Sequence, residues 1–309
     1  MSLYLAIDAG GTKTRCALAD ETRVLARAET GTVKLMRVSE AEATARLRAM
    51  ITQVASAAGV SPGRVQRTCF GLAGSRSESV QQWANAALEG FVGGEVVLCG
   101  DEEIALEGAF HGGPGVLVIA GTGSNAIGRA GDGSMCGAGG WGPVLGDEGS
   151  GYWIGMEAVR SALRVHDEQG EAASTRLLGV VERMWGVGSL GELVALGNLR
   201  VPAEGVKPAD FAALAPEIAR LAREGDAIAT DVLRRAGQQL AELVLLVLRK
   251  LGRGADDVEE VAFAGSVLGE IPLVREAFDV GLAAVRPQLR IREEPADPLD
   301  GAIWRARKR

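Results

Sequence analysis

The sequence contains few of the residues from which metal sites and disulfide frameworks are built. It has two histidines, His111 and His166, and four cysteines that stand far apart. Because no pair of cysteines has metal-ligand spacing, neither a zinc site nor a disulfide framework is expected. We expect buried, reduced thiols and structural histidines instead.

Clusters of positive charge and long apolar runs are also missing. The net charge is −7, and the basic tail 305–309 is short, which argues against nucleic acid or an anionic membrane as the main partner. The most apolar run, Leu243–Leu248, is far shorter than the roughly 20 residues that cross a bilayer. The first residues read as a strand and not as a leader peptide, so the sequence predicts a cytoplasmic protein.

Glycine, by contrast, is abundant, with 43 residues that cluster in turns between short apolar runs. The first half reads as three strands, helix, strand, helix, strand and helix, and from residue 116 the strand, glycine turn and strand begin again. This pattern predicts a duplicated α/β architecture. We expect one domain over 1–113 plus about 295–309, and another over 114–294 with a helical insertion at about 151–252. S-x-x-E capping boxes at Ser39 and Ser75 mark two helix starts.

The first chemical signal is a glycine turn between two strands, Asp8-Ala9-Gly10-Gly11-Thr12-Lys13-Thr14. Around Gly10 and Gly11 no Cβ atom keeps a phosphate oxygen from the backbone N–H groups. Thr12, Lys13 and Thr14 add hydroxyl and cationic donors, and Asp8 is placed to hold magnesium through water. The spacing is neither that of a P-loop nor that of a dinucleotide fingerprint. Alone, the motif fits a plain glycine hairpin equally well.

Two further turns shift the balance toward nucleotide binding. Gly121, Thr122, Gly123 and Ser124 repeat the strand, turn and strand context in the second half. Two such hairpins on either side of a cleft would hold a triphosphate. Later, the buried strand Val261–Ala264 runs into Gly265-Ser266, a small-residue turn against which a purine ring can lie, although it also fits an ordinary helix start.

With these signals in place, the sequence resembles the actin, Hsp70 and sugar-kinase superfamily. Within it, the sequence is similar to the N-acetylglucosamine kinase branch of the BadF/BadG/BcrA/BcrD-type ATPases. The resemblance covers nearly the whole chain, and its most specific blocks are Gly139-Gly140-Trp141-Gly142 and Gly146–Trp153. It implies a duplicated ribonuclease H-like, actin-like ATPase fold of two domains with a cleft, a homodimer, and ATP with Mg²⁺ as cofactors.

The resemblance also implies site residues. Asp101, after a strand and at a helix start, is the expected catalytic base; its structural alternative is a helix N-cap. Trp141 is the expected platform for a sugar ring, and otherwise a core aromatic. The expected sugar-binding residues are Gly74, Gly140, Trp141, Gly142, Asp147 and Glu148. As surface charges, Asp147 and Glu148 would instead stabilise the following helix.

One departure leaves the substrate open. The branch places an asparagine before the first long helix, and 31–38 contains none. Lys34 or Arg37 can instead contact a more acidic substrate. N-acetylglucosamine is the first candidate, with glucosamine and an acidic muropeptide-type sugar as alternatives.

The predicted reaction is in-line transfer of the γ-phosphoryl group of ATP to a sugar hydroxyl, at C6. The zinc-containing repressor and hexose kinase group does not fit the cysteine spacing. A dehydratase-activator ATPase and a non-catalytic sugar sensor stay as alternatives. A DNA-reading regulator would need a helix-turn-helix with a basic face, which the acidic chain does not offer.

Overall fold

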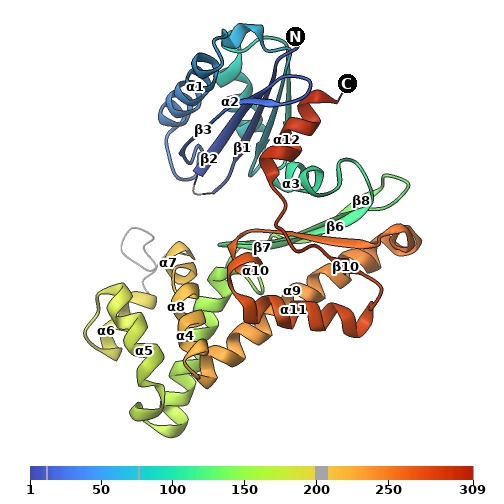
Figure 1. Cartoon of the computed structure of the whole chain (residues 1–309). Helices are drawn as coiled ribbons and strands as arrows, with labels where there is room; N and C mark the ends of the chain where they lie inside the picture. Colours follow the sequence, from blue (N-terminus) through green and yellow to red (C-terminus); the bar gives the residue numbers. More distant parts are fainter. Residues whose placement is uncertain (12, 76, 199–207, 309) are drawn as a thin grey trace. The chain divides into compact units, whose positions relative to one another are not determined.

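The computed structural model describes residues 1–11, 13–75, 77–198 and 208–308 (Figure 1). The chain divides into two compact units. Unit 1 comprises Met1–Gly113 and Ala296–Arg309, and unit 2 comprises Pro114–Pro295. In the described part of the chain, no helix is both long and apolar enough to span a membrane.

Unit 1 is built on a five-stranded sheet of order β3-β2-β1-β4-β5. β1 runs antiparallel to β2, and β2 to β3, whereas β4 and β5 continue the sheet in parallel. The strands are β1 (Tyr4–Ala9), β2 (Lys13–Ala19), β3 (Val24–Gly31), β4 (Arg67–Leu72) and β5 (Glu95–Cys99). Their order along the chain, three strands followed by two that alternate with helices, is the predicted one.

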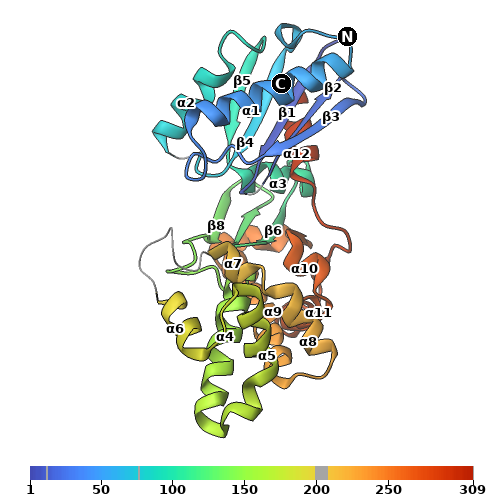
Figure 2. The ribbon, with the colours of Figure 1, turned by 90° about the vertical axis from the view of Figure 1, so that its left-hand side faces the viewer.

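Helices cover both faces of this sheet because its central strands are apolar on both sides. Leu5 and Ile7 of β1 pack with α1 (Glu40–Ala57) and α2 (Glu78–Leu88), whereas Ala6 packs with α3 (Asp101–Phe110) and α12 (Pro298–Arg307). Figure 2 shows α1 and α2 over the strands. A short 3-10 turn, η1 (Pro62–Arg64), precedes β4.

The crossing of α3 and α12 is close enough to require glycine. A Cβ atom at Gly301 would lie 1.8 Å from the Ile104 carbonyl oxygen, and one at Gly108 would lie 2.3 Å from the Asp297 carbonyl oxygen. The C-terminal helix α12 thereby packs against the sheet that the first strands of the chain form.

Unit 2 repeats the topology of unit 1. Its sheet has the order β10-β9-β6-β7-β8, in which β6 is antiparallel to β7 and parallel to β9. Read from β8, the order β8-β7-β6-β9-β10 matches β3-β2-β1-β4-β5 strand for strand. The strands are β6 (Gly115–Ala120), β7 (Ser124–Arg129), β8 (Met135–Gly139), β9 (Glu260–Ala264) and β10 (Arg290–Ile291). The predicted duplication is confirmed.

Helices dominate the rest of unit 2. α9 packs its apolar stripe, which includes Leu240, Val244 and Leu248, against the sheet and against α11. The helices are α4 (Gly151–Gln169), α5 (Glu171–Trp185), α6 (Leu190–Gly197), α7 (Pro208–Ala212), α8 (Ala215–Arg223), α9 (Ala227–Leu251), η2 (Gly252–Asp257), α10 (Ser266–Glu270) and α11 (Pro272–Val285).

Two predicted helix caps need correction. The N-cap of α2 is Ser77 and not Ser75, because the chain after β4 makes an extra turn in which the Ser77 amide bonds to the Gly74 carbonyl. The N-cap of α3 is Gly100, so Asp101 is the first helical residue. The cysteines are free, as predicted, and Cys16, Cys69 and Cys99 are buried.

Candidate functional site

Most of the predicted site residues of unit 1 follow the parallel strands. Because β1, β4 and β5 are parallel, their carboxyl ends meet at one edge of the sheet, where α/β folds bind ligands. The glycine turn follows β1, Gly74 follows β4, and Asp101 follows β5. The structure therefore brings these three segments to a common edge.

The first glycine turn is open above Gly11. In the described part of the chain, no atom lies within 4 Å of the place where a Cβ of Gly11 would stand. Neither Gly10 nor Gly11 has a positive φ. Neither packing nor backbone conformation therefore requires glycine at position 11, and approach by a ligand is the remaining physical reason.

The predicted hydrogen-bond donors beside this turn differ in whether a ligand can reach their side chains. Lys13 is exposed, and its Nζ lies 3.1 Å from Oε2 of Glu29. Thr14 is fully buried, and its hydroxyl has no hydrogen-bond partner among the residues described. Thr12 lies outside the described residues. Of the two that the structure describes, Lys13 is the one whose side chain reaches the surface.

Asp8 is buried next to an arginine that the sequence analysis did not single out. Arg15 donates two bonds to Oδ2 of Asp8, at 3.1 and 2.7 Å, and its Nη2 lies 2.8 Å from Oδ1 of Asp297. Both bonds to Asp8 end on Oδ2 and use neither lone pair of Oδ1. Burial raises the pKa of Asp8, although Arg15 opposes the shift. A cation near Oδ1 would favour the ionised form.

Asp101 occupies the first turn of α3 without capping it. The Gly100 amide donates to Oε1 of Glu103 at 3.3 Å, so the helix start has other support. Burial, a hydrogen bond with Glu102 and the charge of Glu102 raise the pKa of Asp101 to about 7. A carboxylate with a pKa near the working pH suits a general base.

Unit 2 carries the second glycine turn in an equivalent place, between β6 and β7. A Cβ at Gly121 would meet no described atom within 4 Å, and Gly121 has no positive φ, as at Gly11. The turn is held from α4: the Gly151 amide donates to the Gly121 carbonyl at 2.8 Å, and the Tyr152 amide to the Thr122 carbonyl at 3.2 Å. Its amides are thus fixed in place with open space above Gly121.

The third predicted turn lies beside the second. Gly265 has φ 91°, and a Cβ there would be 2.3 Å from the Ala120 carbonyl oxygen. Gly265 and Ser266 follow β9, which is parallel to β6, so both turns are at the carboxyl edge of this sheet. Only glycine permits this close approach.

Asp147 connects the second glycine turn with the predicted sugar-binding loop. The backbone amides of Ser124 and Gly142 hydrogen bond to its carboxylate, while burial raises its pKa overall. Its φ of 62° is unusual for a residue other than glycine. The Ser124 hydroxyl in turn donates to the Glu148 carbonyl at 2.8 Å. The Asp147 side chain therefore holds this loop to the second glycine turn, whereas Glu148 contributes its backbone carbonyl.

Trp141 lies in the same loop and is exposed over 74% of its surface. The alternative of a core aromatic is wrong, because the glycines around it supply no side chains that could bury the ring. Gly140 and Gly142, on either side, have φ of 73° and 87°. A large aromatic side chain held out from a glycine-rich turn is available as a platform for a ligand.

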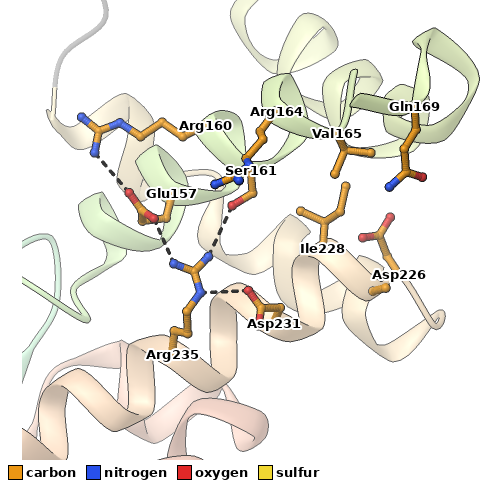
Figure 3. Close-up of a pocket in the computed structure, with 11 residues that line it drawn as sticks. Glu157, Arg160, Ser161, Arg164, Val165, Gln169, Asp226, Ile228, Asp231 and Arg235 are labelled. Carbon is orange, nitrogen blue, oxygen red and sulfur yellow. Dashed lines mark hydrogen bonds and ion pairs between the residues drawn. The ribbon is translucent and has the colours of Figure 1, made fainter. Parts of the chain in front are cut away.

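A pocket of about 670 Å³ lies between α4 and α9 of unit 2 (Figure 3). Arg235 reaches from α9 to Glu157 at 3.0 Å, to Asp231 at 2.8 Å and to the Ser161 hydroxyl at 3.3 Å. None of the predicted site residues lines it. Its charges neutralise one another, so we do not assign the proposed chemistry to it.

Three residues that organise the edge of unit 1 were not predicted from the sequence. Arg15 holds Asp8, Asp297 pairs with Arg15, and the Thr32 hydroxyl donates to the Gly10 carbonyl at 3.0 Å. Asp297 carried a signal, since an Asp before Pro298 is typical of a helix N-cap, and it does cap α12. Nothing in the sequence pointed to its contact with Arg15, 282 positions away.

Comparison with known proteins decides the family. The model of the BadF/BadG/BcrA/BcrD ATPase family matches residues 5–303. The chain belongs to this family. Both the resemblance and the α/β fold that it implied are confirmed.

Characterised members and solved structures match the chain from end to end. The N-acetylmuramic acid/N-acetylglucosamine kinase of Clostridium acetobutylicum is 29% identical over 99% of each chain. The N-acetyl-D-glucosamine kinase of Dictyostelium discoideum is 27% identical over 97% of this chain and 96% of its own. A Chromobacterium violaceum protein for which N-acetylglucosamine kinase activity has been proposed has 28% identity and a TM-score of 0.74, with 98% of each chain covered.

Proposed function

We propose that this member of the family is an ATP-dependent kinase of an amino sugar, with N-acetylglucosamine as the first candidate. The observation that carries the proposal is the pair of open glycine turns. The two hairpins have equivalent places in their sheets; Gly11 is the second residue after β1 and Gly121 the first after β6, and neither glycine is required by packing or by φ. Phosphate groups are the ligands that such backbone amides bind.

The reaction would be a direct phosphoryl transfer. A sugar hydroxyl, at C6 by the resemblance, attacks the γ-phosphorus of ATP, and the bond from that phosphorus to the oxygen bridging to the β-phosphate breaks. ADP leaves, and Asp101 accepts the proton of the attacking hydroxyl. A pKa of about 7 leaves Asp101 ionised in a large fraction of molecules near neutral pH.

Magnesium fits the residues at the first turn. Mg²⁺ usually keeps several waters and is bound through one or two carboxylates together with substrate phosphates. Asp8 offers one oxygen that Arg15 does not use. The described residues contain no cluster of three or more His, Cys, Asp or Glu that would hold a metal alone. When bound, the ion would neutralise phosphate charge, and Asp8 would hold it directly or through water.

Sugar binding is proposed for the loop after β8 in unit 2, and Gly74 is a separate sugar-binding prediction in unit 1. The exposed ring of Trp141 supplies an apolar face, and Gly140 and Gly142 leave backbone groups accessible. Asp147 orients this loop through the Gly142 amide. Such a site combines one platform with a few fixed polar groups, as small-molecule sites do.

The resemblance also leads us to propose a homodimer, and the need for ATP a cytoplasmic location. Light scattering coupled to gel filtration tests the first proposal: a mass near 64 kDa, twice the 32.1 kDa of the chain, supports it, and a monomer mass contradicts it.

The experiment that tests the function is ADP release from Mg-ATP with a panel of sugars. The panel contains N-acetylglucosamine, glucosamine, N-acetylmuramic acid and glucose, with a reaction that lacks sugar as the control. Stimulation by an amino sugar, with a phosphorylated product found by mass spectrometry, supports the proposal. Slow ADP release that no sugar changes would favour a dehydratase-activator ATPase or a sugar sensor.

A further inference from the structure

A second cavity lies within unit 1, at the carboxyl ends of β1 and β4. Its volume is about 390 Å³, within the range of small-ligand sites. The segment 33–36 and the start of α2 form its walls. Its lining is mainly apolar and includes Val33, Leu35, Leu72, Val80 and Trp83. Ala9 and Gly74, at the ends of the two strands, place it next to the first glycine turn.

Among the residues that the structure describes, Lys34 is the only charged one that lines this cavity. It is half-buried, and in the described part of the chain its ammonium group has neither an ion pair nor a hydrogen bond. Three other cations of unit 1 are paired: Lys13 with Glu29, Arg15 with Asp8, and Arg46 with Glu42. An ammonium group beside apolar walls, with no partner in the chain, is favoured by an anion in the cavity.

The backbone of Lys34 is fixed relative to the first glycine turn. Its amide donates to the Thr32 hydroxyl at 3.1 Å, and that hydroxyl donates to the Gly10 carbonyl at 3.0 Å. Its carbonyl accepts bonds from the amides of Arg37 and Val38. The cation therefore stands on a rigid segment, so little backbone ordering is needed when a ligand binds.

We propose that this cavity binds a carboxylate-bearing substituent of the sugar and that Lys34 pairs with the carboxylate. The inference rests on the proposed function and refines its substrate to amino sugars with an acidic side chain, such as an ether-linked carboxyalkyl group. The carbon atoms of the substituent would contact Val33, Leu72 and Trp83. The hydroxyls of Ser77 and Ser79, 2.9 Å apart, supply further polar groups at the wall.

The structure also separates Lys34 from the other cation of this segment. Arg37 is exposed and does not line the cavity. Lys34→Met therefore removes the proposed partner, whereas Arg37→Met removes the same charge three residues away. Lys34→Arg keeps the charge in place.

The test is the ratio of kcat/KM for N-acetylmuramic acid to kcat/KM for N-acetylglucosamine, since the first sugar carries a lactyl ether and the second does not. A charge-assisted hydrogen bond predicts that Lys34→Met lowers this ratio by roughly 10- to 100-fold. Lys34→Arg should restore part of it, and Arg37→Met should leave it as in the wild type. An unchanged ratio in Lys34→Met, or a wild type that phosphorylates only the neutral sugar, would overturn the inference.

Calorimetric titration separates failure of the inference from failure of the proposed function. If the wild type phosphorylates no sugar, the kinase proposal fails, and the binding of N-acetylmuramic acid still tests the cavity. Binding that Lys34→Met weakens by at least 10-fold supports the cavity assignment. Absence of binding, or equal binding by both proteins, contradicts it.

Discussion

The two glycine turns have the same topology but are anchored by different groups. In unit 1, the buried carboxylate of Asp8 is held by the guanidinium of Arg15, which also binds Asp297. In unit 2, the buried carboxylate of Asp147 is held by the backbone amides of Ser124 and Gly142. One turn thus depends on an ion-pair network, and the other on backbone hydrogen bonds.

The difference extends to what each unit offers a ligand. Unit 1 presents Asp8, Asp101 and Lys34 at its edge, whereas unit 2 presents Asp147, Glu148 and the exposed ring of Trp141. The two copies of the fold thus share a framework and differ in the side chains that they place at its edge. Changes in unit 1 are expected to alter the reaction step, and changes in unit 2 to alter affinity.

The largest expected effect is that of Asp101→Asn. Loss of the general base should lower kcat by about 10²- to 10⁴-fold while KM for the sugar changes little. Steady-state ADP release with and without sugar measures it, and circular dichroism shows whether the variant is folded. A variant that keeps more than a tenth of wild-type kcat would remove Asp101 from its proposed role.

Arg15→Met should have the next largest effect, on stability. It leaves the buried Asp8 and the partly exposed Asp297 without their shared cation, and because solvent screens Asp297, we expect a loss of about 1–3 kcal/mol. Urea unfolding at pH 7 measures it. Lys13→Met, which removes an exposed ion pair of the same turn, is the matched control and should cost less than about 1 kcal/mol.

The pH dependence sharpens this test. Removal of Arg15 takes away an influence that lowers the pKa of Asp8, so the pKa of Asp8 rises further in the variant. Protonation of a carboxyl with a raised pKa favours the folded state. The difference between Arg15→Met and wild type should therefore shrink as the pH falls toward 4. A difference that does not depend on pH would show that lost packing, and not lost charge, destabilises the variant.

The same contrast separates what the sequence could reveal from what it could not. Strands, the duplication, and the glycine turns at Gly11 and Gly121 follow from local patterns of apolar residues and glycine. The contact of Arg15 with Asp297 does not, because it depends on α12 packing back onto the first sheet. The start of α2 was misplaced because Ser75 and Ser77 are both plausible caps, and the turn geometry selects Ser77.

The candidate site likewise contains residues that the sequence could reveal and features that it could not. Asp101 and Trp141 were found through the family resemblance, and their surroundings confirm neither role. The solvent-exposed ring and the raised pKa emerge only in three dimensions. The cavity beside Lys34 could not be predicted, since its walls come from segments around residues 9, 34, 73 and 80.

Trp141→Ala should act on affinity and not on stability. Loss of an aromatic platform is expected to raise KM for the sugar by roughly 3- to 10-fold, with kcat little changed. Because the ring is 74% exposed, the free energy of unfolding should change by less than about 0.5 kcal/mol. Leu145→Ala, exposed in the same loop, is the control. Equal KM values in wild type and Trp141→Ala would exclude the stacking role.

The smallest expected effect is a shift of the pH profile by Glu102→Gln. A base must be ionised, so kcat/KM of the wild type should fall as the pH drops below about 7, the pKa of Asp101. Burial is the largest cause of the raised pKa and stays in the variant, whereas the charge of Glu102 is lost. The acid limb should therefore move to lower pH but remain above 3.8, the ordinary value for an aspartate.

The free energy of unfolding should also depend on the protonation of Asp101. Catalysis requires the ionised carboxylate, whereas the folded state is favoured by the protonated one. Between pH 3.8 and about 7, the folded protein binds a proton at Asp101 that the unfolded chain has released, so the free energy of unfolding falls as the pH rises through this window. Asp101→Asn should remove that slope, and Glu102→Gln should lower the upper pH limit of the window over which the free energy of unfolding falls.

An acid limb of kcat/KM in Glu102→Gln that coincides with the wild-type limb would mean that another group controls the pH profile of kcat/KM. The unit 2 variant Trp141→Ala should leave the limb where it is, because its effect is on sugar affinity alone.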